Sequence, residues 1–190
     1  MKPSESRSAT LFTRLADPKQ TGIDFVSPVD LEHKKSFLYH SGTATGGVAI
    51  GDVDGDGKPD LYIVSGPRGN KLYGQVGELK FADITAKAGA GLDGGDAWGS
   101  GVAMADVNND GRLDIYVCNY DQPNQLFVNL GPGKNGEPVV FAERAKEYGL
   151  DIVDASHSAY FADYDHDGRL DVYLLTNRYD DPGGFNPIMP

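Results

Sequence analysis

One nine-residue pattern occurs three times in this chain, and it restricts the possible folds more than any other feature does. It reads Asp, any residue, Asp or Asn, any residue, Asp, Gly, two further residues and Asp, and each copy precedes a short apolar run. The copies begin at Asp52, Asp106 and Asp163, so they are 54 and 57 residues apart. An internal repeat of this length indicates an architecture of successive similar units.

Each whole repeat predicts four short strands. The second strand is a continuous apolar run, which is typical of a strand that is covered on both faces. Clusters of Gly, Pro, Asn and Asp separate the runs and predict turns, and residues 145–149 predict a helical turn. The expected strands are residues 47–50, 61–64, 71–76 and 79–84 in the first repeat and residues 101–104, 115–118, 125–130 and 139–144 in the second.

This arrangement predicts an all-β fold in which each four-stranded antiparallel repeat of about 55 residues forms a β-propeller blade. A β-sandwich also contains many short strands, but it does not account for repeats at this period. Propellers typically have four to eight blades, whereas this chain holds about three and a half. We therefore expect a partial propeller.

The repeats divide the chain into five expected segments. Residues 11–25 share a Phe and Gly pattern with the fourth strands, so they predict a lone fourth strand at the front. The third repeat stops halfway, which predicts that the natural protein continues beyond Pro190 and supplies the remaining blades there, with association of two copies as the alternative. The segments are a disordered tail (1–10), the front strand and its connection (11–46), repeat 1 (47–100), repeat 2 (101–157) and an incomplete repeat 3 (158–190).

Carboxylates at alternate positions of a loop indicate a cation site. Two carboxylates about 4 Å apart near a protein surface repel each other by roughly 4 kcal/mol, and a bound cation removes this repulsion. Alternate side chains turn inward when the backbone curls around one ion, and Ca²⁺ takes six to eight oxygen ligands in a flexible geometry. The alternative is a solvated acidic turn, against which three copies in register, each with the same Gly, argue.

We therefore predict up to three Ca²⁺ ions, each bound by four side chains and by the backbone carbonyl of the basic residue at position seven. The basic side chains are expected to point outward. Three ions would change the formal charge of the chain from −11 to −5. The predicted ligands are Asp52, Asp54, Asp56, Lys58 and Asp60 in the first loop, Asp106, Asn108, Asp110, Arg112 and Asp114 in the second, and Asp163, Asp165, Asp167, Arg169 and Asp171 in the third.

Other metal sites fit the pattern less well. An EF-hand requires Glu at position twelve, where this chain has Ile63, Val117 and Leu174 within apolar runs. Mg²⁺ prefers a few protein ligands and retained waters. Zinc prefers His or Cys, and the one His in these loops, His166, stands between ligand positions and is expected to be exposed.

The composition excludes several classes of function. A net charge of −11 argues against general binding to a phosphate backbone. No run of 18 apolar residues is present, so no membrane insertion is expected. The N-terminal residues lack the apolar segment of a signal peptide. Cys118 lies in an apolar run and predicts a buried thiol without an internal disulfide.

The loops with their flanking strands, such as GVAIGDVDGDGKPDLYI, resemble FG-GAP (VCBS) repeats, as in integrin α-subunit propellers. Together with NKLY, FADITAKAG and the leading FTRL segment, residues 11–178 are closer to bacterial proteins of the ASPIC/UnbV and cartilage-acidic-protein type. The resemblance implies a propeller of seven or eight blades with calcium in the blade loops. It also implies an extracellular or periplasmic setting, roles in adhesion or recognition, and an N-terminal strand that completes the last blade.

These features predict a non-enzymatic calcium-binding propeller module, in which calcium is structural and other loops recognise a protein or glycan. The alternatives are a propeller lyase or hydrolase with a site in the central channel, and a lectin that stacks sugars on aromatic residues. No nucleophile triad, P-loop or dinucleotide motif is present. We expect Trp98 and the recurring Tyr62, Tyr116 and Tyr173 to pack in the interior.

Overall fold

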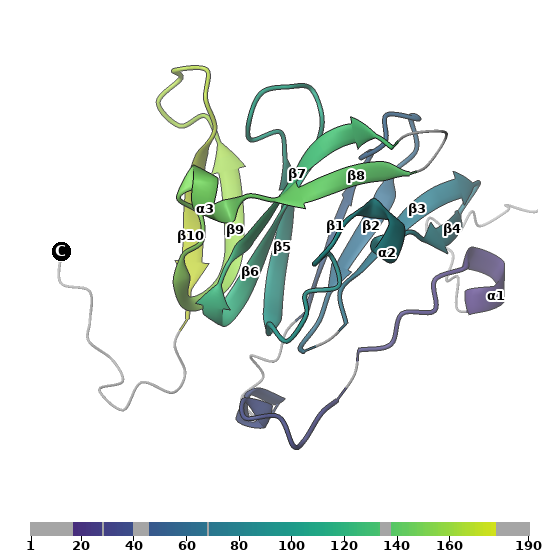
Figure 1. Ribbon diagram of the computed structural model, residues 1–190, viewed down its shortest axis with the longest axis horizontal. Helices are drawn as coiled ribbons and strands as arrows, with labels where there is room; N and C mark the ends of the chain where they lie inside the picture. Colours follow the sequence, from purple (N-terminus) through teal and green to yellow (C-terminus); the bar gives the residue numbers. More distant parts are fainter. Residues whose placement is uncertain (1–16, 28, 40–45, 68, 134–137, 178–190) are drawn as a thin grey trace, which may run out of the picture.

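The computed structural model describes residues 17–27, 29–39, 46–67, 69–133 and 138–177 (Figure 1). The first repeat forms a four-stranded antiparallel sheet in the order β1 (Gly47–Gly51), β2 (Asp60–Val64), β3 (Lys71–Gly77) and β4 (Lys80–Asp83). In the register of this sheet Ala49 pairs with Tyr62, and Tyr62 pairs with Leu72. The four strands predicted for this repeat are therefore confirmed.

The second repeat forms an equivalent sheet in the order β5 (Gly99–Ala105), β6 (Asp114–Pro123), β7 (Gln125–Pro132) and β8 (Val139–Glu143). The third unit consists of β9 (Val153–Ala162) and β10 (Asp171–Thr176), which pair antiparallel. The far end of β6 also pairs with the start of β9, with Tyr120 opposite Ala155. Two four-stranded antiparallel units followed by a two-stranded third unit form the propeller-type fold that the repeats predict, present as a partial propeller.

Short helices follow the fourth strands. These are α2 (Thr85–Ala88) after β4 and α3 (Ala145–Tyr148) after β8, and the second confirms the predicted helical turn. The described part of the front segment contains α1 (Pro18–Thr21) and the 3₁₀ helix η1 (Ser36–Tyr39). The predicted tail at residues 1–10 and the part of the predicted front strand at residues 11–16 lie outside the described residues.

The helix of one unit packs on the fourth strand of the next unit. Gly22 follows α1, and a Cβ atom added there would lie 2.1 Å from the carbonyl oxygen of Phe81 on β4. Gly89 follows α2, and its added Cβ would lie 2.6 Å from the carbonyl oxygen of Phe141 on β8. The segment that contains α1 thus contacts the first sheet as the helix of a preceding blade would.

The first strands of neighbouring units lie side by side, β1 against β5 and β5 against β9 (Figure 1). Glycine permits this close approach, because a Cβ on Gly101 would lie 2.0 Å from the backbone oxygen of His157. The second sheet is consequently covered on both faces, and β6 is buried from Asp114 to Tyr120. This explains why its sequence is apolar without alternation.

Two apolar cores lie between the units. The first contains Tyr62 and Val64 of one sheet and Ile115, Val117 and Phe127 of the next. The second lies between the second and third units and contains Tyr116, Cys118 and Ala159. Burial raises the pKa of the Cys118 thiol to about 12, so the predicted buried thiol is confirmed.

A third cluster surrounds Trp98, whose side chain is fully buried. Its ring lies 5.0 Å from the ring of Tyr39 and 5.4 Å from that of His33, and Leu38 and Tyr120 complete the cluster. The packing role predicted for Trp98 is confirmed, because a buried indole has no face to offer to a sugar.

The third unit differs from the other two in exposure. Tyr62 and Tyr116 are 0% and 1% exposed, whereas Tyr173, at the same place in the repeat, is 70% exposed. The interior position predicted for Tyr173 is therefore wrong among the described residues, since no third strand or further sheet covers β10 there. Among the described residues, no helix is long and apolar enough to span a membrane.

Candidate metal centres

The three Asp-rich loops join the first and second strands of the three units. They connect β1 to β2, β5 to β6 and β9 to β10, and all three project from the same end of the molecule (Figure 1). Because the units are related by the repeat, each loop carries the same pattern of ligand positions. The predicted ligands therefore form three separate groups, one for each loop.

The Asp at position one organises each loop. In the first loop its oxygens accept hydrogen bonds from the backbone N–H groups of Asp56 and Gly57, at 3.2 and 2.8 Å. The same two bonds recur from Asp110 and Gly111 to Asp106, at 2.9 and 2.7 Å, and from Asp167 and Gly168 to Asp163, both at 3.0 Å. The three loops therefore share one conformation, as their shared sequence predicts.

This conformation depends on left-handed backbone at positions four and six. Gly57, Gly111 and Gly168 at position six have φ values of 82°, 83° and 86°, which only glycine adopts without steric cost. Position four is also left-handed, and Gly55, Asn109 and His166 stand there. Asn tolerates this region, and His166 is exposed as predicted.

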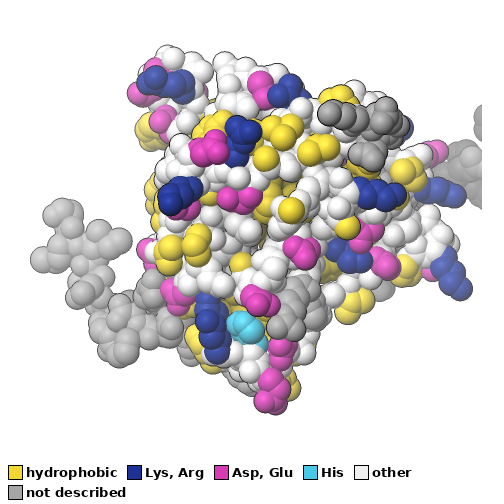
Figure 2. Space-filling model, in the orientation of Figure 1, with side chains coloured by type: hydrophobic (Ala, Val, Ile, Leu, Met, Phe, Trp, Pro, Cys, Tyr) yellow, Lys and Arg dark blue, Asp and Glu magenta, His cyan; other side chains and the backbone are white. Residues whose placement is uncertain are grey.

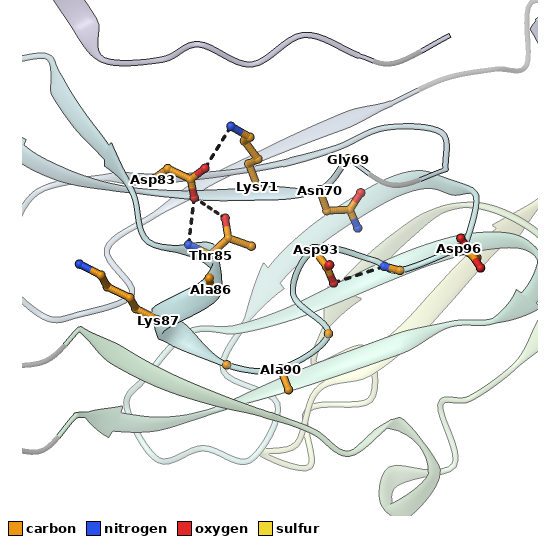
Figure 3. Close-up of a pocket in the computed structure, with 13 residues that line it drawn as sticks. Gly69, Asn70, Lys71, Asp83, Thr85, Ala86, Lys87, Ala90, Asp93 and Asp96 are labelled. Atoms are coloured by element: carbon orange, nitrogen blue, oxygen red, sulfur yellow. Dashed lines mark hydrogen bonds and ion pairs between the residues drawn. The ribbon is translucent and has the colours of Figure 1, made fainter. Parts of the chain in front are cut away.

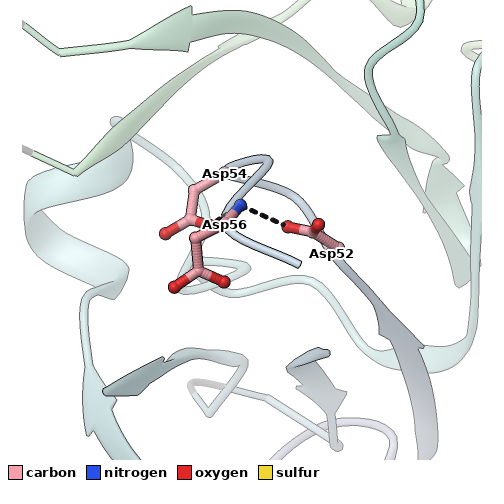
Figure 4. A group of neighbouring side chains, drawn as sticks. All are labelled: Asp52, Asp54 and Asp56. Carbon is pink, nitrogen blue, oxygen red and sulfur yellow. Dashed lines mark hydrogen bonds between the residues drawn. The ribbon is translucent and has the colours of Figure 1, made fainter. Parts of the chain in front are cut away.

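The carboxylates at alternate positions converge (Figure 4). One oxygen from each of Asp52, Asp54 and Asp56 lies within 4.8 Å of the others, and Asp163, Asp165 and Asp171 form a similar group. Two ligands of one Ca²⁺ ion are at most about 5 Å apart, because each Ca–O distance is 2.3–2.6 Å. Hard carboxylate oxygens at this spacing fit Ca²⁺ in donor type and separation.

The Asp at position nine has a second role that its place in the pattern did not predict. Asp60 is 1% exposed, and its two oxygens accept the backbone N–H groups of Val53 at 2.9 Å and Gln75 at 2.8 Å. Asp114 is equally buried and accepts those of Val107 at 3.0 Å and Asn129 at 2.7 Å. These carboxylates tie the loop to the third strand of its own sheet.

Burial sets the electrostatics of position nine. It raises the pKa of both Asp60 and Asp114, and the two backbone hydrogen bonds to each partly oppose this shift. A carboxylate oxygen that accepts one N–H bond keeps a second lone pair. The role of Asp60 and Asp114 as closing calcium ligands stays a prediction. Asp171 is exposed and accepts a bond from Tyr164 N–H at 2.9 Å.

The basic side chains at position seven fold back onto the loops. Lys58, Arg112 and Arg169 each pair with the Asp at position five of their own loop, namely Asp56, Asp110 and Asp167. Figure 2 shows basic side chains lying against acidic ones at the upper edge of the molecule. The hydrogen bond from Lys58 lowers the pKa of Asp56. The expected outward orientation is therefore wrong, because a positively charged side chain close to several carboxylates is attracted to them.

A groove of about 940 Å³ lies beside the first sheet, between α2 and the connection to β5 (Figure 3). Some of its polar groups are bound to one another or to a neighbouring residue: Lys71 lies 3.0 Å from Asp83 and 3.1 Å from Asp24, which is not a lining residue, and Thr85 donates to Asp83 at 2.7 Å. The bond to Asp83 raises the pKa of Lys71, and hydrogen bonds from the Tyr73 hydroxyl and from Lys71 lower the pKa of Asp24. The groove offers a polar surface, on which Lys71, Asp83 and Thr85 are bound to one another.

Comparisons with known proteins support the repeat assignment. Cartilage acidic protein 1 of Mus musculus is 30% identical to this chain over 138 residues, which are 72% of this chain and 20% of the mouse protein. The Homo sapiens protein is 30% identical over 134 residues, 70% of this chain and 19% of that protein. Integrin alpha pat-2 of Caenorhabditis elegans is 46% identical over 73 residues, 36% of this chain and 6% of the integrin.

The chain therefore spans about a fifth of the length of the cartilage acidic proteins that it matches. The sequence model of the FG-GAP-like repeat matches it twice, at residues 52–117 and 106–174, and each match begins at position one of a loop. These matches cover more than half of the chain, and they contain all three loops. The chain belongs to the family of FG-GAP-like repeat proteins.

Proposed function

We propose that this chain is a calcium-binding propeller module in which each Asp-rich loop binds one structural Ca²⁺ ion. The observation that carries the proposal is the convergence of carboxylate oxygens within 4.8 Å of one another in the first and third loops, together with the conformation that all three loops share. The proposed ligands are the side chains at positions one, three, five and nine and the carbonyl at position seven, the fifteen residues predicted above. Ca²⁺ would displace the basic side chain from position five.

The proposed role of calcium is to hold the first and second strands of each blade together. Each loop joins these two strands, and its carboxylates repel one another at the effective dielectric of a protein surface. The loop backbone is already curled by the bonds to position one, so little ordering remains for the ion to impose. Extracellular calcium modules bind at about 10⁻⁴–10⁻³ M, and we expect affinities in this range.

Calcium titration tests the proposal. At 10 mM Ca²⁺ a site with such an affinity adds about 1.4–2.7 kcal/mol to the stability of the folded state. For a chain of this size that corresponds to a rise in Tm of several degrees for each occupied site. We expect calorimetry to give up to three ions per chain and Asp56→Ala to remove one of them. No binding heat and an unchanged Tm at 10 mM Ca²⁺, relative to NaCl of equal ionic strength, would contradict the proposal.

We further propose that the module serves extracellular recognition or adhesion, through protein or glycan partners, without catalysis. The support is similarity to cartilage acidic protein 1 and to integrin alpha chains. The negative charge of the chain favours neither nucleic acid nor anionic membranes as partners. Membership of the ASPIC/UnbV subgroup, and a periplasmic as opposed to a cell-surface setting, stay predictions.

We also propose that further propeller strands cover the third unit. Tyr160 and Tyr173 are 62% and 70% exposed beside Val172, on a hollow of about 660 Å³. Gly149 ends α3 as Gly89 ends α2, but an added Cβ there would meet nothing within 4 Å. The third unit thus presents the surfaces that the first and second units bury against their neighbours.

Hydroxyl-radical footprinting tests this cover. We expect Tyr173 to be labelled readily in the 190-residue chain and to be protected in a natural protein that carries the following blades. Tyr62, which is buried in the first unit, is the matched control and should stay protected in both. Equal labelling of Tyr173 in the two proteins would contradict the proposal.

A further inference from the structure

Asn129 on β7 contacts two Asp-rich loops at once. Its side chain is fully buried, and its Nδ2 donates to the carbonyl oxygen of Val53 in the first loop at 2.8 Å and to that of Leu113 in the second loop at 3.1 Å. Its Oδ1 accepts the backbone N–H of Gly131 at 2.9 Å, which fixes the orientation of the amide. One amide group from the second unit therefore bridges the loops of the first and second units.

The backbone of Asn129 is bound to the second loop as well. Its N–H donates to Asp114 at 2.7 Å, and its carbonyl oxygen accepts a bond from Nε of Arg112 at 3.0 Å. Both partners belong to the second loop, at positions nine and seven. Any change in the second loop that moves Asp114 or Arg112 thus acts on Asn129.

The bond to Val53 acts on the ligands of the first loop. Val53 lies between Asp52 and Asp54, it is buried, and its own N–H donates to Asp60 at 2.9 Å. The peptide groups on both sides of Val53 are therefore held, one by Asp60 of the same sheet and one by Asn129 of the neighbouring sheet. The directions of the Asp52 and Asp54 side chains follow from these peptide groups.

We propose that Asn129 is a positioning residue for the first calcium site and that it couples this site to the second. The inference rests on the calcium sites proposed above. Calcium in the second loop fixes Asp114, Asp114 fixes Asn129 through its bond to the Asn129 N–H, and Asn129 fixes the backbone that carries Asp52 and Asp54. Because coupling between binding sites is reciprocal, calcium in the first loop favours binding in the second by the same factor.

The repeat supplies a matched control residue. Gln75 stands fifteen residues after Asp60, as Asn129 stands fifteen residues after Asp114, and each donates its backbone N–H to that Asp. The side chain of Gln75 donates to the carbonyl oxygen of Gly77, within its own strand, at 2.9 Å. Gln75→Ala should therefore leave the calcium sites of other units unchanged.

The experiment is a calcium titration of the 190-residue protein followed by NMR, with the amide signals of Gly57, Gly111 and Gly168 as one reporter for each loop. The midpoint of each reporter is the Ca²⁺ concentration at which its signal has changed by half. In Asn129→Ala we expect the midpoint of Gly57 to rise at least about fivefold, in the usual range of coupling between sites. The midpoint of Gly168 should stay unchanged in this variant, and Gln75→Ala should leave the midpoints of Gly111 and Gly168 unchanged.

Substitutions of exposed loop carboxylates test the coupling even if Asn129→Ala does not fold. Asp110→Asn weakens the second site, and we expect it to raise the Gly57 midpoint at least about fivefold, whereas Asp167→Asn, in the third loop, leaves it unchanged. Asp56→Asn should raise the Gly111 midpoint by the same factor. In a folded Asn129→Ala background, Asp110→Asn should have no further effect on Gly57.

The outcomes separate the inference from the proposed function. If no glycine reporter responds to Ca²⁺, the proposed calcium sites are contradicted, and the proposed coupling between them is contradicted as well. If all three reporters titrate but Asp110→Asn leaves the Gly57 midpoint unchanged, the sites stand and the coupling is overturned. Equal shifts of all three reporters in Asn129→Ala would indicate a general loss of stability and would overturn the positioning role.

Discussion

Asp114→Ala is expected to lower the free energy of unfolding by about 2–3 kcal/mol in the presence of a calcium chelator. The substitution leaves the N–H groups of Val107 and Asn129 without their acceptor, and each unpaired buried group costs about 1–3 kcal/mol. Burial raises the pKa of Asp114, so removal of its charge recovers part of this cost. Urea denaturation followed by circular dichroism measures the loss.

Asp171→Ala is the matched control for this prediction. Asp171 occupies the same position of the third loop, but it is exposed and accepts one backbone bond, from Tyr164. Water can replace a carboxylate at an exposed site, so we expect a change within about 0.5 kcal/mol. Equal losses in the two variants would show that position nine does not act through the third strand.

Tyr62→Ala is expected to cost about 3–5 kcal/mol, the range for removal of a large side chain from a core. Tyr62 is fully buried between the first and second sheets, and its hydroxyl donates to the carbonyl oxygen of Leu92 at 2.5 Å. The substitution leaves a cavity and an unpaired carbonyl between the two units. The midpoint of urea denaturation should fall by about 1–2 M.

The control for Tyr62 is Tyr173, which follows the position-nine Asp by the same two residues. Its side chain is 70% exposed, so Tyr173→Ala should change the stability of the 190-residue chain by no more than about 0.5 kcal/mol. A loss comparable with that of Tyr62→Ala would mean that another surface covers the third unit in solution.

Much of the fold was predictable from the sequence because its information is local. The turn residues and apolar runs of each repeat predicted the strands β1 to β8, and the structure has them near the expected bounds, except that β6 continues to Pro123 through residues where a turn was predicted. The loop conformation was equally predictable, since it depends on bonds between residues at most five positions apart, such as Gly57 N–H to Asp52. Repetition made each local prediction stronger.

The candidate sites were predictable only in part. The acidic positions could be read directly, but the orientation of Lys58, Arg112 and Arg169 could not, because it depends on how close the carboxylates come in three dimensions. Asn129 was missed altogether. Its one sequence signal is an Asn in the otherwise apolar strand QLFVNL, where a buried amide needs partners.

The sequence by itself determined the repeating unit, its strand order and the acidic loop, because each follows from residues that are neighbours along the chain. The tertiary structure decided which copies of the same residue are buried. Tyr62 and Asp60 are enclosed because a further strand or sheet lies against them, and Tyr173 and Asp171 are open because none does among the described residues. Burial is a property of what packs against a residue, and a repeat gives identical residues different neighbours.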